Sequence, residues 1–153
     1  MQLMKTIDSA LSLKREKRSK MRIFVISMLA MGIFGPSAMA DSFWNHNGSL
    51  MRLRASGNER VFEYEVPSPK MRATGVQRGT ILFNGVRQGN RYVGTARVFS
   101  RDCSVPLEYS VEGRVVTEKY VVLSGQREVY APGCVPTGRM IEDMLEFRYR
   151  FKE

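Results

Sequence analysis

The alternation of apolar and polar side chains along the chain predicts β-strands. It is clearest near the C-terminus, where Met144–Phe151 places Leu145, Phe147, Tyr149 and Phe151 on one face and Glu146, Arg148, Arg150 and the following Lys152 on the other. A period of two is typical of an antiparallel strand with one buried and one solvated face. Around Phe62–Val66 the same alternation assigns Glu63 and Glu65 to the solvated face.

Similar short runs recur between turn residues from Ser49 onward, whereas no window shows a helical period. The pattern predicts about eight strands, at Leu50–Arg54, Phe62–Val66, Thr80–Asn84, Arg91–Ser100, Leu107–Val111, Tyr120–Leu123, Gln126–Tyr130 and Met144–Phe151. Residues before Ser49 are expected to be strand-free, and residues 67–79 to form a long connection. The fold class is therefore all-β. We favour a single small antiparallel barrel over a two-sheet sandwich, because closure removes exposed strand edges.

The first 40 residues have the features of a signal peptide. Basic residues at 14–22 precede the uncharged run 23–34, and Ala38 and Ala40 supply a small-x-small cleavage site. The apolar run is too short for a transmembrane helix, so no transmembrane segment is expected in the mature chain. We predict cleavage after Ala40, leaving one domain over 41–153 in the periplasm or outside the cell. Translation from Met1 and from Met21 both remain open.

Cys103 and Cys134 are the two cysteines of the chain. Export to an oxidising compartment turns such a pair into a disulfide. Closing a loop of about 30 residues stabilises a domain by about 3 to 4 kcal/mol in the chain-entropy model. A catalytic thiol is the alternative.

After the leader, basic residues outnumber acidic ones only slightly. Residues 41–153 contain 17 basic and 13 acidic side chains, a net charge of +4, which disfavours nucleic acid as a partner. Fourteen of the 17 are arginines, whose guanidinium suits carboxylates and phosphates, although codon usage explains the bias equally well. If the strands at 91–100 and 144–151 are neighbours, a basic strip suited to an anionic envelope component would comprise Arg97, Arg101, Arg148 and Arg150. The alternative is a solvated face balanced by Glu146.

The segment Trp44–Met51, WNHNGSLM, resembles the opening of avidin-like and lipocalin-like barrels, where a tryptophan starts the first strand near the closed end. The resemblance implies that a basic residue from the end of the barrel packs over Trp44, and Arg148 or Arg150 is the matching candidate. The chain from Asp41 onward also resembles a small family of exported bacterial β domains. That second resemblance implies no activity.

Catalytic and metal-binding patterns are sparse in the sequence. His46 is the single histidine and has no Gly-x-Ser-x-Gly elbow beside it, so we expect a mobile surface histidine and no catalytic residue. With the cysteines oxidised, no metal site is expected, and no cofactor. Glu63 and Glu65 would suit glycosidic chemistry only if they lined a pocket.

These observations favour an exported non-catalytic binding module that holds an apolar ligand or docks on a protein or envelope polymer. Its candidate binding residues are Trp44 and the four arginines of the predicted strip. One alternative is a secreted enzyme inhibitor that presents the loop between Cys103 and Cys134, and a small hydrolase is a third. An open interior of about 300 Å³ or more would distinguish a ligand carrier from a solid inhibitor. The oligomeric state stays open.

Overall fold

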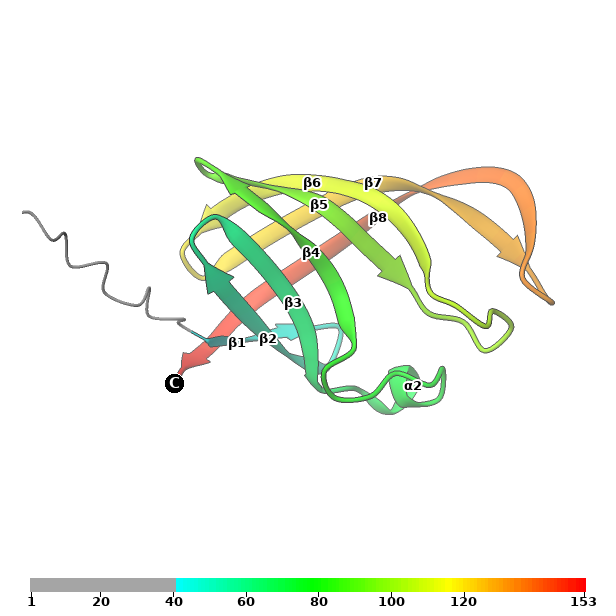
Figure 1. Ribbon diagram of the computed structural model, residues 1–153, viewed down its shortest axis with the longest axis horizontal. Helices are drawn as coiled ribbons and strands as arrows, with labels where there is room; N and C mark the ends of the chain where they lie inside the picture. Colours follow the sequence, from blue (N-terminus) through cyan, green and yellow to red (C-terminus); the bar gives the residue numbers. More distant parts are fainter. Residues whose placement is uncertain (1–40) are drawn as a thin grey trace, which may run out of the picture. The chain divides into compact units, whose positions relative to one another are not determined.

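The computed structural model describes residues 41–153, which form a closed antiparallel barrel (Figure 1). Each strand pairs with the next in sequence, and β1 closes the barrel against β8. The elements are β1 (Ser42–His46), β2 (Ser49–Ser56), β3 (Glu59–Val66), α2 (Pro69–Arg72), β4 (Ile81–Gln88), β5 (Arg91–Val98), β6 (Leu107–Thr117), β7 (Tyr120–Ala131) and β8 (Val135–Lys152). The predicted barrel is confirmed, and the sandwich alternative is wrong.

The predicted signal peptide and the predicted cleavage site after Ala40 lie outside the described residues. Within 41–153, none of the helical structure has the length and apolar character needed to span a bilayer.

The predicted number of strands is right, but the prediction omits one strand and divides another into two. β1 lies in the segment expected to be strand-free, and β7 is one continuous strand where two were predicted. The division was placed at Gly125, where a turn was expected. Instead, a Cβ atom on Gly125 would lie 2.1 Å from the carbonyl oxygen of Ser110, so glycine allows a close approach of β7 to β6.

Aromatic side chains fill the middle of the barrel. Phe62 of β3 stacks on Phe147 of β8 with ring centroids 3.8 Å apart, and both side chains are fully buried. Trp44 meets the same Phe62 edge-on at 5.8 Å, and the ring centroid of Phe83 lies 6.4 Å from that of Phe62. The core therefore consists of interlocking rings drawn from four strands.

The core face predicted for the C-terminal strand is right except at its end. Leu145 and Phe147 are buried, and Tyr149 packs partly buried against the core. Phe151, however, is 49% exposed and stacks on Phe43 at 4.7 Å. The pairing of β1 with β8 shifts register between Phe43 and Trp44, which separates this aromatic pair from the core cluster.

The two ends of the barrel differ. At the end that we call the turn end, short turns join β2 to β3, β4 to β5 and β6 to β7. At the opposite end, the loop end, lie the connector 67–80 with α2, the loop 99–106 and the tip of the β7–β8 hairpin (Figure 1). The long β7–β8 hairpin extends toward the same side as these loops. All the extra chain length is therefore concentrated at one end.

The prediction that Glu63 is solvated is wrong. The side chain points away from the core, as the alternation requires, but only 4% of Glu63 is exposed. Its carboxylate accepts a hydrogen bond from Nε of Arg52 at 2.8 Å and pairs with Arg54 at 3.1 Å. The neighbouring Glu65 pairs at 2.5 Å with Arg78 of the connector, so ion pairs cover this outer face and attach the connector to the barrel.

Candidate binding cleft

The wall of the barrel opens between β6 and β7 at the loop end. The pairing of these two strands extends from Thr117↔Tyr120 at the turn end only to Glu112↔Ser124. Beyond that point β6 remains paired with β5 as far as Leu107, and β7 remains paired with β8 as far as Ala131. Gly125 of β7 still lies against Ser110, so the strands separate beyond this contact, and the facing edges of 107–109 and 126–131 have no ladder partner across the gap.

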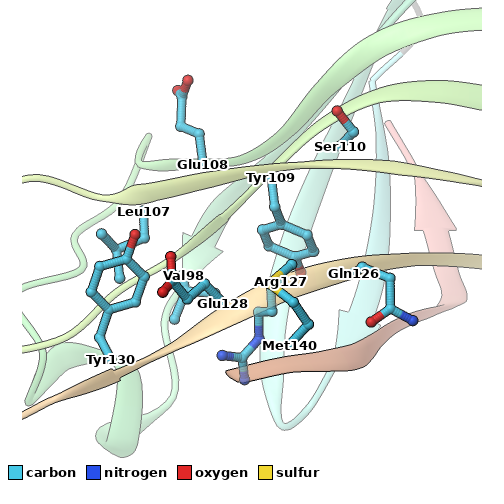
Figure 2. A pocket seen from close by; sticks show the side chains of 10 residues that line it. All are labelled: Val98, Leu107, Glu108, Tyr109, Ser110, Gln126, Arg127, Glu128, Tyr130 and Met140. Carbon is cyan, nitrogen blue, oxygen red and sulfur yellow. The ribbon is translucent and has the colours of Figure 1, made fainter. Parts of the chain in front are cut away.

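A cleft of about 330 Å³ occupies this opening (Figure 2). Figure 2 shows Leu107 and Tyr109 pointing into it from β6, and Glu128 and Tyr130 pointing into it from β7. The complete lining comprises Val98, Leu107, Glu108, Tyr109, Ser110, Gln126, Arg127, Glu128, Tyr130 and Met140. The cleft therefore combines two phenol rings and aliphatic side chains with charged groups along its edges, a mixture typical of binding sites.

A hydrogen-bonded trio fixes the floor of the cleft. The hydroxyl of Tyr109 donates to Oδ2 of Asp143 at 2.8 Å, and Nε of Arg127 donates to the same oxygen at 2.9 Å. Burial, together with the bond to Asp143, raises the pKa of Tyr109 far above its ordinary value, so the phenol stays protonated and remains a donor. The trio holds the Tyr109 ring in one orientation at the cleft.

The predicted disulfide is confirmed and closes the outer boundary of this opening. Cys103 lies in the loop that leads into β6, and Cys134 lies at the tip of the β7–β8 hairpin, with Cα atoms 5.0 Å apart. One edge of the gap is thus limited by the last β6–β7 pair and the other by a covalent bond. The last β6–β7 pair and the disulfide therefore limit how far β6 and β7 can separate.

Further hollows lie at the same end. One of about 310 Å³ lies between the connector and the disulfide-bonded loop, where Val76, Phe99 and Pro106 contribute to its walls. Another of about 350 Å³ lies along the connector between Pro67 and Arg78. The concave surface that these hollows provide is on the loop end.

Trp44, predicted as a binding residue, is buried. Only 5% of it is exposed, its Nε1 donates to Oγ of Ser42 at 2.8 Å, and its ring meets Tyr149 edge-on at 5.5 Å. Neither Arg148 nor Arg150 covers it, because both face outward. Arg148 lies 4.4 Å from the ring centroid of Tyr120 and pairs with Glu146 at 3.1 Å. Trp44 therefore belongs to the core.

A basic residue does lie over an aromatic ring at the end of the barrel, but with different partners. Arg60 is buried at the turn end, 5.7 Å from the ring centroid of Tyr92, and its guanidinium donates to the carbonyls of Gly57 and Glu59. Sequence analysis missed this residue. Its position beside the Gly57-Asn58 turn was the available signal.

The four arginines do not form one strip. β5 and β8 are separated by β6 and β7, so the condition for the strip is not met. Arg97 pairs with Glu108 at 2.7 Å and bonds Asn84 at 2.6 Å, and Arg101 donates to the carbonyl of Ala73 in the connector. Arg148 and Arg150 lie on the last residues of β8, toward the turn end. Two of the four thus brace the loop end and two are solvated.

His46 is buried, which contradicts the expected mobile surface position. It is 6% exposed and stacks on Phe147 at 4.9 Å. Its Nδ1 lies 2.9 Å from the carbonyl of Glu146, the geometry of a donated bond, and its Nε2 lies 3.4 Å from the amide nitrogen of Asn47. Burial lowers the pKa of His46, so the neutral ring predominates. The error came from placing residues before Ser49 outside the sheet.

No group of three or more His, Cys, Asp or Glu side chains arranged to hold a metal ion occurs within residues 41–153. In comparisons with known proteins, no family model, curated protein or solved structure matches this chain. The argument for function therefore depends on the cleft itself.

Two charged residues gave a sequence signal for the cleft that was not used. By the alternation along each strand, Arg127 of β7 lies on the same face as the buried Leu123, and Asp143 of β8 on the same face as the buried Leu145. A charge on an otherwise apolar face marks a position where the core ends or where a buried pair forms. The separation of β6 from β7 had no comparable signal.

Proposed function

We propose that this protein is an exported, non-catalytic binding module whose partner binds at the cleft between β6 and β7. The observation that carries the proposal is the contrast between a core filled with stacked rings and a barrel wall that opens sideways. A carrier of the avidin or lipocalin type holds its ligand inside the barrel, whereas here Phe62, Phe83 and Phe147 occupy that position. Binding at the side of the barrel fits this geometry better than binding inside it.

The groups that line the cleft support recognition more than bond cleavage. Arg127 and Tyr109 are both engaged by Asp143, and Arg97 holds Glu108. Paired charges of this kind orient a partner but lack the free carboxylate pair that glycosidic hydrolysis uses. The disulfide supports an oxidising compartment, since such bonds persist there.

An enzyme inhibitor is the second candidate, and one observation favours it. Val105 is 64% exposed in the loop 99–106, two residues from the disulfide that fixes this loop. An apolar residue on a constrained loop can enter the active-site cleft of a hydrolase without losing much conformational entropy on binding. The cleft and this loop are both at the loop end, but they are separate surfaces.

Site-specific photo-crosslinking tests both candidates in the cells to which the gene belongs. A photoreactive phenylalanine analogue at Gln126 reports on the cleft, one at Val105 reports on the loop, and one at the exposed Gln88 of the turn end serves as control. The proposal predicts adducts from Gln126 alone. Adducts from Val105 alone, identified as a hydrolase, support the inhibitor; equal labelling from all three positions, or none, contradicts both. Digestion of the adduct shows whether the partner is protein, glycan or lipid.

A further inference from the structure

The geometry points to an extended polypeptide segment as the partner of the cleft, added as a β-strand along the free edges of β6 and β7. This inference rests on the proposed function and specifies its ligand. A strand inside a sheet uses its main-chain groups on both sides, and an unpaired edge is a template for another chain. Beyond the contact of Gly125 with Ser110, β6 is paired with β5 over Leu107–Tyr109 on one side only, and β7 is paired with β8 over Gln126–Ala131 on one side only.

The length of the free edge sets the length of the segment. β6 extends five residues beyond its last pair with β7, but Gly125 of β7 still lies against Ser110, so the open edge of β6 comprises Leu107–Tyr109. At about 3.4 Å per residue this edge is about 10 Å long, which matches about three residues of an extended segment. The disulfide and the contact between Gly125 and Ser110 limit the edge at its two ends, so a longer strand would have to leave the cleft on either side.

The side chains of the cleft add specificity for alternate residues of the segment. Successive side chains of a strand point to opposite faces, so every second one would face the barrel. There it would meet Tyr109, which Asp143 holds in place, and the aliphatic side chains of Val98 and Leu107. These positions of the segment should therefore carry apolar residues.

Charge complementarity favours a cation on the segment. Glu108 is neutralised by Arg97 and Arg127 by Asp143, whereas Glu128 forms no ion pair with any residue of 41–153. Its Oε1 accepts only the backbone N–H of Gly138, at 2.7 Å. Glu128 lines the cleft at the β7 edge, so its charge faces whatever binds there. A lysine or arginine of the segment would supply the missing partner.

The first test uses the full barrel and a fluorescein-labelled heptapeptide of alternating lysine and valine, measured by fluorescence anisotropy. We expect saturable binding that weakens at least tenfold when glutamate replaces lysine. It should weaken by a similar factor when alternate amides are N-methylated, because methylation removes the donors on one edge without changing the side chains. Equal affinity for the N-methylated peptide, or no binding of the lysine peptide, overturns the inference.

Two matched variants locate the contact. E128Q should weaken binding of the lysine peptide about 3- to 10-fold, whereas E118Q, the same change at an exposed residue of the turn end, should leave the affinity unchanged. Amide hydrogen exchange gives an independent readout, since the peptide should slow exchange in 107–109 and 126–131. Equal effects of the two variants, or slowed exchange elsewhere only, overturn the inference.

The outcomes separate this inference from the proposed function. Crosslinking of a glycan or lipid from Gln126, with no peptide binding, leaves the cleft as the binding site but excludes the polypeptide. A concentration-dependent dimer that protects the same amides would make a second copy of this chain the occupant, and would also overturn the peptide inference. Absence of adducts from Gln126 removes the proposed function itself.

Discussion

The turn end and the loop end of the barrel are formed by the same strands but are stabilised differently. Toward the turn end β6 and β7 pair with each other as well as with β5 and β8, and Arg60 lies over Tyr92 beneath the turns. Toward the loop end β6 and β7 separate, and a disulfide and the hydrogen-bonded trio of Tyr109, Arg127 and Asp143 take the place of the missing ladder. Regular packing thus supports the part of the barrel without a cleft, and specific bonds support the part with one.

The largest effect is expected from truncating the ring at the centre of the packed region. Phe147→Ala removes a fully buried side chain stacked on Phe62 and His46, and should lower the free energy of unfolding by about 3 to 5 kcal/mol. Chemical denaturation followed by the fluorescence of Trp44, the single tryptophan, measures this loss. Phe151→Ala, on the same strand but half exposed, should cost about 1 kcal/mol or less. Equal losses would contradict the assignment of Phe147 to the core.

Removing the disulfide tests what holds the loop end together. The double variant C103S/C134S should lose about 3 to 4 kcal/mol, because the bond closes a loop with a sequence separation of 31 residues. Hydrogen exchange should quicken in 125–138 and remain slow in the packed strands around Phe62. Uniformly faster exchange would mean that the bond supports the whole barrel equally. Thiol titration of the wild-type protein should find no free thiol.

The sequence predicted the packed region better than the open one, and the reasons are physical. Alternation located Phe147 and Leu145 in the core because a slip of one residue would expose every apolar side chain. β1 was missed because His46 and Asn47 are polar, although Asn47-Gly48, with positive φ at both residues, is the turn pair typical of a two-residue hairpin. That dipeptide was the available evidence for a strand on each side of it.

The cleft could not be predicted in the same way. Side-chain alternation along β6 and β7 does not report whether the two strands are paired, because pairing depends on the relative course of two backbones. Gly125 was interpreted as a turn, whereas its role is to let β7 cross close to Ser110 before the strands separate. The disulfide was predicted from export and cysteine count, but its position across the opening required the structure.

A buried carboxylate on the outer face provides the next test of the packed region. Glu63→Gln removes the charge that Arg52 and Arg54 both contact, and should cost about 1 to 3 kcal/mol. Solvent weakens these ion pairs, because 29% of the Arg52 side chain and 38% of the Arg54 side chain are exposed. Glu112→Gln, which removes an exposed pair with Arg91, should change stability by about 0.5 kcal/mol or less. A larger loss of unfolding free energy for Glu112→Gln than for Glu63→Gln would contradict the stabilising role assigned to the buried carboxylate of Glu63.

Acidification should weaken the packed region through His46. Burial lowers the pKa of His46 in the folded state below the ordinary histidine value of 6.5, so below pH 6.5 the unfolded chain takes up a proton that the folded chain does not. Stability is therefore complete above pH 6.5 and falls as the pH decreases toward the folded-state pKa, by at most about 1.4 kcal/mol per pH unit. Denaturation at several pH values between 7 and about 5.5 measures the slope. Because the sequence has one histidine, His46→Phe should abolish it; an unchanged slope in this variant would assign the effect to other groups.

The smallest effect is expected on the solvated face of β8, at Arg148. The guanidinium lies 4.4 Å from the ring centroid of Tyr120 and 3.1 Å from Glu146, but 63% of the side chain is exposed. An exposed cation–π contact contributes about 0.5 to 1 kcal/mol, and an exposed ion pair adds little more because solvent and salt screen it. Arg148→Ala should therefore lower the free energy of unfolding by about 1 kcal/mol or less, and Arg150→Ala, the next outward residue on the strand, by less still. Because neither side chain contacts Trp44, the emission maximum of Trp44 should be the same in both variants and the wild type. A loss of several kcal/mol for Arg148→Ala, accompanied by a shifted emission maximum, would mean that this arginine covers the indole and that the outer face of β8 takes part in the packing after all.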